Sequence, residues 1–113
     1  MALVQGQLGA VDVAGTGTLT TIYTVPASKA ASVNITIANR ADTATNIRVA
    51  HIKASASVAN EDYLMYDFST TLLVDNRAPI IFTGIIMGAA DTIRVYSSAS
   101  AVSVAVNGIE DDA

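Results

Sequence analysis

Hydrophobic and polar residues alternate along most of this chain, with the period of two that a β-strand requires. The segment ASVNITIAN (31–39) has branched aliphatic side chains at every second position, with Ser, Asn and Thr between them. NIRVAHIK (46–53), DTIRVYS (91–97) and AVSVAVNG (101–108) follow the same pattern. No long stretch has a helical period, so we predict half-buried antiparallel strands. The side chains predicted to be buried are Val33, Ile35, Ile37, Ile47, Val49, Ile93, Val95, Val102, Val104 and Val106.

Shorter segments complete the pattern. TTIYTV (20–25) and YLMYDF (63–68) are candidate strands, and IIFTGIIM (80–87) is a more continuous apolar run whose internal glycine suggests a bulge. Turn-forming residues separate these segments, which recur roughly every ten residues, as in sandwiches and related all-β folds. The sequence therefore predicts an all-β fold: a single antiparallel β-sandwich, jelly-roll-like, with about seven or eight strands.

The chain has 113 residues, which fits one domain. Residues 13–108 are expected to form the sandwich. Residues 1–12 are either an N-terminal arm or an edge strand. Residues 109–113, IEDDA, form an acidic C-terminal tail that we expect to be frayed. The least regular segment, 67–79, is expected to be a long connection between the two sheets.

Composition limits the function. Charged residues make up only 14% of the chain, so part of its surface is expected to be covered by another chain. A net charge of −4 and a pI of about 4.5 argue against nucleic acid. The absence of cysteine rules out disulfides and thiolate metal sites. There is no long apolar run and no secretory leader pattern, so we expect no membrane association and assembly in a cytoplasm.

The segment EDYLMYDF (61–68) combines carboxylates with aromatic rings and could form a catalytic pair, a calcium site or a sugar platform. On a regular strand, Tyr63 and Tyr66 would lie on opposite faces, so the rings would be split. Glu61 and Asp62 would then lie at the solvated start of the strand. We interpret the segment as an ordinary strand with one wet face.

Catalysis has little support in this sequence. His51 is the only histidine, and it lies near the end of a predicted strand. A histidine base requires a nucleophile and an orienting partner, and no recognised arrangement supplies them. We therefore expect no enzyme activity, no cofactor, no metal and no small-molecule substrate.

Three phrases in order, IYTVPASKAASVNITIANR, NEDYLMYD and FTGIIMGAADTIRVYSSASAVSVAVNG, resemble small all-β structural proteins of tailed bacteriophages. The resemblance covers residues 20–108. It implies a virion component without catalytic residues, located on the head, the tail or the baseplate.

From these observations we expect a homotrimeric capsid decoration or cement protein that binds the major capsid protein or another virion protein in the virion. A tail, baseplate or fibre-attachment component is the alternative. A carbohydrate-binding or adhesin module is a second one, and it would require the rings of Tyr23, Tyr63, Tyr66 and Tyr96 to face solvent. If residues 1–12 form an arm, its partner-binding anchors would be Leu3, Val4 and Leu8, and its glycines would allow close backbone approach.

Overall fold

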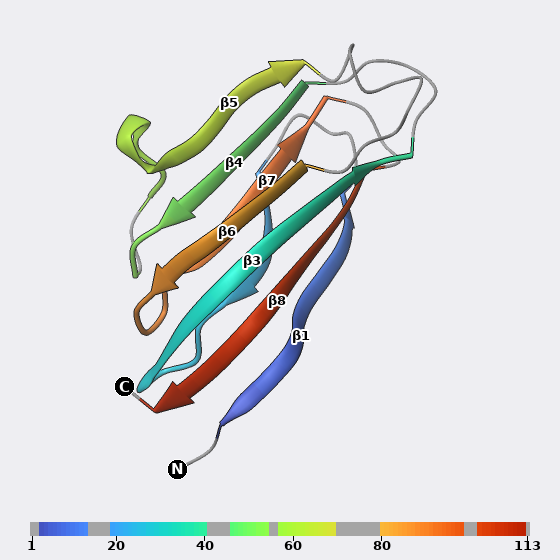
Figure 1. Cartoon of the computed structure of the whole chain (residues 1–113). Coiled ribbons are helices and arrows are strands. Elements are labelled where there is room, and N and C mark those ends of the chain that lie inside the picture. Colours follow the sequence, from blue (N-terminus) through green and yellow to red (C-terminus); the bar gives the residue numbers. More distant parts are fainter. Residues whose placement is uncertain are drawn as a thin grey trace.

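A computed structural model describes residues 3–13, 19–40, 46–54, 57–69, 80–98 and 102–112. In these residues the chain is all-β, with two antiparallel sheets of four strands (Figure 1). A short 3₁₀ helix, η1 (Asn60–Asp62), precedes one strand. The strands are β1 (Val4–Val13), β2 (Thr20–Thr24), β3 (Lys29–Asn39), β4 (Asn46–Ile52), β5 (Tyr63–Ser69), β6 (Ile80–Met87), β7 (Thr92–Ser97) and β8 (Val102–Asp112).

The strand order shows how the chain is connected. The first sheet has the order β1-β8-β3-β6 and the second the order β2-β7-β4-β5. Strand β1 pairs with β8, β2 with β7, β3 with β6 and β4 with β5, all antiparallel. Along the chain these pairs are nested, each one enclosing the next. Within each sheet, pairing of β3 with β8 and of β4 with β7 joins two of these pairs side by side.

The core lies between the two sheets. Every side chain predicted to be buried is at most 2% exposed, so that prediction is confirmed. The alternation explains this result, because the aliphatic positions of each strand point at the opposite sheet and the polar positions point outward. Further core side chains come from strand ends and from shorter strands: Val13, Ile22, Tyr23, Val25, Ala31 and Met87.

The C-terminal segment differs from the prediction. Residues 109–112 are not frayed, because they continue β8, with Glu110 opposite Val4 and Asp112 opposite Lys29. The acidic side chains have partners. Lys29 Nζ forms an ion pair with Asp112, and the Tyr23 hydroxyl donates a hydrogen bond to Glu110. Burial raises the pKa of the Tyr23 phenol, and the adjacent Glu110 carboxylate raises it further.

The N-terminal segment forms the edge strand of its own sheet. Strand β1 pairs with β8 along its length, with a register shift between Gln7 and Gly9. Gly9 also lies against the other sheet, since a Cβ there would be 2.6 Å from the carbonyl oxygen of Ile22. The close backbone approach expected of the N-terminal glycines is therefore made at Gly9, to the chain's own β2.

Two local predictions also change. Glu61 and Asp62 lie in η1 and not at the start of a strand, and Asp62 Oδ2 accepts a hydrogen bond from the backbone N–H of Ala59 at 2.8 Å. Strand β5 continues to Ser69, into the segment predicted to be a connection. Most of that connection, residues 70–79, lies outside the described residues.

Candidate functional site

The outer surface of the first sheet is made of small, mostly uncharged side chains, and we call it the first-sheet face. Its rows run across all four strands; for example, Gln5, Ile109, Ser32 and Ile86 lie side by side. The register assigns it Gln5, Gln7, Ala10 and Asp12 of β1, Ser103, Ala105, Asn107, Ile109 and Asp111 of β8, Ala30, Ser32, Asn34, Thr36 and Ala38 of β3, and Ile81 and Ile86 of β6.

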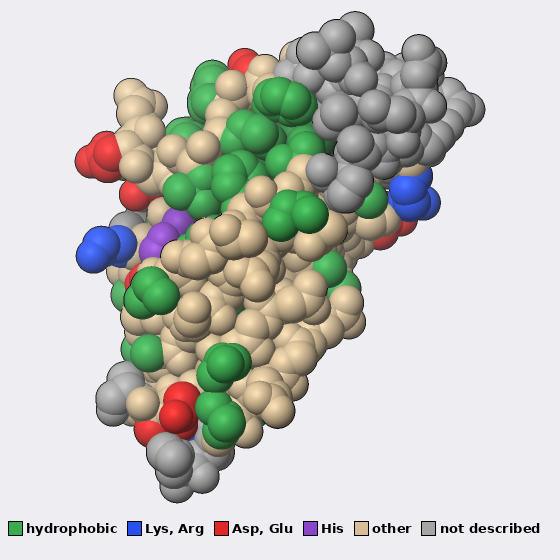
Figure 2. Space-filling model, in the orientation of Figure 1, with side chains coloured by type: hydrophobic (Ala, Val, Ile, Leu, Met, Phe, Trp, Pro, Cys, Tyr) green, Lys and Arg blue, Asp and Glu red, His purple; other side chains and the backbone are tan. Residues whose placement is uncertain are grey.

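Charge is confined to the two ends of the first-sheet face. Asp12 lies at one end, paired with Arg40 at 2.5 Å, and Asp111 lies at the other. Arg40 Nε also donates a hydrogen bond to the Ser103 hydroxyl at 2.7 Å. Figure 2 shows no acidic or basic patch over the middle of β3 and β8. A partner that covers this middle part would not have to desolvate a charge.

The first-sheet face is shallowly hollowed where its side chains are smallest. One hollow of about 390 Å³ lies over β1, β8 and β3 and is lined by Ala10, Ala38 and Ala105 among others. A second, of about 300 Å³, lies beside Ile86 and Ile109. These isoleucines are 70% and 47% exposed, so the face combines hollows with projecting apolar side chains.

The predicted anchors have different environments. Leu3 and Val4 are 54% and 45% exposed, whereas Leu8 packs against the core. Ile86 and Ile109 were not predicted as contact residues. The sequence could have indicated that Ile109 is exposed, because it continues the alternation of β8 on the side of Asn107. For Ile86 the sequence gives no such indication, because the apolar run of β6 does not alternate.

The outer surface of the second sheet has a different chemistry, which centres on the tyrosine cluster: Arg48, Tyr63, Tyr66, Asp67 and Tyr96. The Arg48 guanidinium carbon lies 4.1 Å from the ring centroid of Tyr66 and 4.5 Å from that of Tyr96. The rings of Tyr63 and Tyr66 are 4.9 Å apart and nearly perpendicular. These are the geometries of cation–π and edge-to-face contacts.

The contact between Tyr63 and Tyr66 overturns the prediction that their rings are split. The pairing of β5 with β4 shifts register between Ile47 and Val49 and again between Val49 and Ala50. Asp67 has a φ of 53°, a left-handed conformation that Asp adopts more readily than most residues. Each bulge changes which face the following side chain occupies, so residues three apart lie on the same face.

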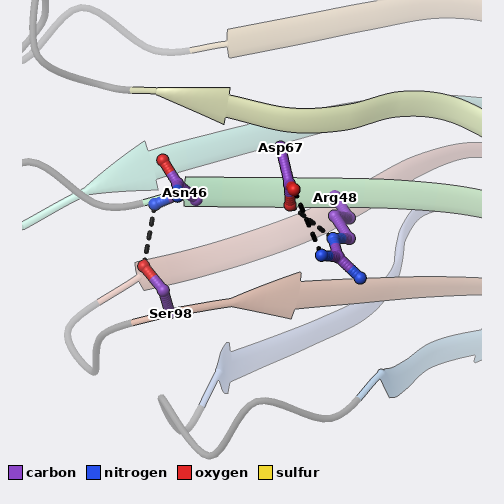
Figure 3. Close-up of polar contacts among 4 residues, drawn as sticks. All are labelled: Asn46, Arg48, Asp67 and Ser98. Carbon is purple, nitrogen blue, oxygen red and sulfur yellow. Dashed lines mark hydrogen bonds and ion pairs between the residues drawn. The ribbon is translucent and has the colours of Figure 1, made fainter.

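Arg48 and Asp67 fix the geometry of the tyrosine cluster. Figure 3 shows the Asp67 carboxylate directed at the Arg48 guanidinium from the neighbouring strand. Arg48 Nε and Nη2 donate to Asp67 Oδ1 and Oδ2 at 2.5 and 3.2 Å. The hydrogen bond to Asp67 raises the pKa of Arg48, against the opposing effect of burial. At the start of β4, Asn46 N donates to the Ser98 hydroxyl at 2.8 Å, which ties this strand to the end of β7 (Figure 3).

A hollow of about 390 Å³ adjoins the tyrosine cluster. It is lined by Asn60 of η1 together with Tyr63 and Tyr66. Tyr66 is 57% exposed. Tyr23, which an adhesin would also have to present, is only 7% exposed and belongs to the core.

His51 has a structural environment. Its Nε2 lies 2.9 Å from Asp91 Oδ2. Asp91 also accepts hydrogen bonds from the backbone N–H groups of Ala54 and Gly88, at 3.1 and 3.0 Å. Burial would raise the pKa of Asp91, but the hydrogen bonds from His51 and the backbone outweigh it and hold that pKa below its usual value. Asp91 thus ties the end of β4 to the turn between β6 and β7.

The described ranges contain no group of three or more His, Asp or Glu side chains placed to hold a metal ion. They also contain no helix of the length and apolarity needed to cross a membrane. The sequence matches no protein-family model and no curated protein.

Proposed function

We propose that this chain is a non-enzymatic structural protein of a phage virion, which binds the outside of the capsid as a decoration or cement protein. The observation that carries the proposal is the first-sheet face, whose middle rows contain no charge and whose Ile86 and Ile109 project into solvent. Binding through such a face buries apolar surface without breaking ion pairs.

The size of the first-sheet face fits this role. With strands about 4.8 Å apart and about 3.4 Å per residue, the part between Ala30 and Ala38 spans roughly 600 Å². A standard protein–protein interface buries about 800 Å² on each partner, and its centre is depleted of charged residues. Leu3, which is exposed just before β1, would extend the contact.

The connectivity supports the proposal at the level of the fold. The nested pairs β1–β8, β2–β7, β3–β6 and β4–β5 are those of a jelly roll, and we propose that the domain is one. Jelly rolls are common among viral capsid proteins and lectins. Since a fold alone does not assign a function, the face described above carries the argument.

The test uses particles of the phage that encodes this chain, purified from a deletion strain. The purified protein is added and the particles are sedimented. We expect the wild type to co-sediment and to appear on the capsid exterior by electron cryo-microscopy. A double variant, Ile86→Glu with Ile109→Glu, should not bind.

Thr24→Glu is the matched control, because Thr24 is exposed on the second sheet, and this variant should bind normally. Extra density on the tail or baseplate would instead support the alternative virion location. A chain that is absent from wild-type virions by mass spectrometry would overturn the proposal.

A further inference from the structure

The hollow beside the tyrosine cluster has features that the proposed function does not use. It is lined by Asn60, Tyr63 and Tyr66, and its volume of about 390 Å³ lies within the range of small-molecule sites, about 300–1,000 Å³. Two tyrosine rings meet there at right angles, and one of them is more than half exposed. The hollow thus places an exposed aromatic ring and a half-buried one beside a side-chain amide.

The chemistry of these residues matches a sugar. A pyranose ring has an apolar face of C–H groups and a rim of hydroxyls. Tyrosine offers an apolar ring face together with a polar hydroxyl. The Asn60 amide can both donate and accept hydrogen bonds, as neighbouring sugar hydroxyls require.

The electrostatics select a neutral ligand. Arg48 lies over the rings of Tyr66 and Tyr96, and the bidentate contact with Asp67 offsets its charge. Glu61 is exposed in η1, next to Asn60. The cation that contacts the rings is therefore already paired, which favours a neutral ligand over a phosphate or another strong anion.

The cluster is also held in place before any ligand binds. Arg48 stacks on Tyr66 and is fixed by Asp67 from the adjacent strand. Tyr66 packs against Tyr63. A ring that is already positioned loses little conformational entropy on binding, which favours affinity.

We propose that Asn60, Tyr63 and Tyr66 form a binding site for a neutral oligosaccharide. The site lies on the outer surface of the second sheet, opposite the first-sheet face. A copy bound to a particle through its first sheet would therefore direct the sugar site toward solution. The inference does not depend on capsid binding, because the two surfaces belong to different sheets.

The test is a glycan array with the full-length chain, containing neutral and acidic bacterial and animal glycans, followed by calorimetry with the strongest ligand. We expect selective binding of neutral glycans. Tyr66→Ala should weaken binding about tenfold or more, as should Asn60→Ala. Tyr66→Phe keeps the ring and should retain most of the affinity.

Ile86→Ala, on the opposite sheet, is the control and should bind sugar normally. Thermal melting of each variant separates lost binding from lost folding. Chemical-shift mapping with the bound glycan should place it at Tyr63 and Tyr66. No glycan binding on the array, binding of acidic glycans alone, capture only of a protein partner by these residues, or binding unaffected by Tyr66→Ala would each overturn the inference.

Discussion

Branched aliphatic side chains fill the space between the sheets and make the largest favourable contribution to stability. Ile35 and Ile47 are fully buried, and the core cluster to which they belong consists mostly of valines and isoleucines. The chain is rich in alanine, but alanine fills little of this volume. The space vacated by a truncated isoleucine or valine therefore stays largely empty. Truncation of one of them leaves a cavity that rigid sheets cannot close.

Ile35→Ala should lower the free energy of unfolding by about 2–4 kcal/mol, and Val104→Ala by about 1–3 kcal/mol, through lost burial and the cavity. Urea denaturation followed by circular dichroism measures both. Ile86→Ala, at a position that is 70% exposed, is the matched control and should change stability little. Unchanged stability in both core variants would contradict the assigned strand faces.

Asp91→Ala should destabilise the fold by about 1–3 kcal/mol near neutral pH, because the N–H groups of Gly88 and Ala54 lose their acceptor. The pKa of Asp91 in the folded state is below its usual value of 3.8. The carboxylate therefore contributes stability above that value and loses it as pH falls through the folded pKa.

The gap in melting temperature between the wild type and Asp91→Ala should accordingly narrow at acidic pH. Melting curves between about pH 7 and about pH 3 test this expectation. Asp12→Ala, which removes an exposed carboxylate, should show a small gap throughout. A gap for Asp91→Ala that stays constant over this range would contradict the linkage.

At the same scale, sequence patterns predicted burial well and ring placement poorly. The position of Ile35 follows from alternation alone. The contact of Tyr63 with Tyr66 depends on the register shift between Val49 and Ala50, which falls between Tyr63 and Met65 on β5. This bulge is set by pairing with β4, which alternation within β5 does not reveal.

The strands depend on one another through close backbone contacts. Strand β8 lies between β1 and β3, and Gly108 is opposite both Gly6 and Val33. A Cβ at residue 108 would be 2.1 Å from the carbonyl oxygen of Ser32. Since that atom is backbone, relief would require the strands to separate locally.

Gly108→Ala should therefore destabilise the domain by about 1–3 kcal/mol. Gly88→Ala is the control, because the atom nearest to its new Cβ would be Asp91 Oδ2, at 3.9 Å. Thermal melting of the two variants side by side is the measurement. Equal melting temperatures would show that β8 and β3 are farther apart than the structure has them.

Deletion of residues 2–9 should unfold or severely destabilise the domain, since it removes most of β1 and the partner of β8. The deletion also removes Leu8, whose side chain packs against the core. Far-UV circular dichroism and hydrogen exchange of β8 amides report the outcome. Deletion of residues 2 and 3, which precede β1, should leave the melting temperature almost unchanged. A truncated chain of near-normal stability would favour the arm interpretation.

At the scale of elements, most strands could be located from sequence, but their partners could not. Alternation specifies a face, whereas the pairing of β1 with β8 joins opposite ends of the chain. The acidic residues of β8 illustrate the same limit. Their sequence is typical of a frayed tail, and their partners, Lys29 and Tyr23, lie far away along the chain.

For the whole molecule, the two sheets present different surfaces: small uncharged side chains on one side and the tyrosine cluster on the other. If one side faces a particle and the other faces solution, contacts between subunits must use the sides of the sandwich. The edge strand β5 carries Leu64 and Phe68, which are 43% and 39% exposed. In Figure 2, hydrophobic side chains gather over β4 and β5. Exposed apolar groups on an edge strand favour association with another copy.

We therefore expect the isolated protein to form a defined oligomer, and a homotrimer fits the local three-fold positions of a capsid lattice. Phe68→Asp should dissociate it, because a charge at the subunit contact would lose its hydration. Ile86→Asp places the same charge on the first-sheet face and should leave the oligomer intact. Light scattering coupled to size-exclusion chromatography at high micromolar concentration measures the molar mass of the wild type and of both variants. A monomeric wild type would contradict self-association in solution, and dissociation by Ile86→Asp alone would move the subunit contact to the first-sheet face.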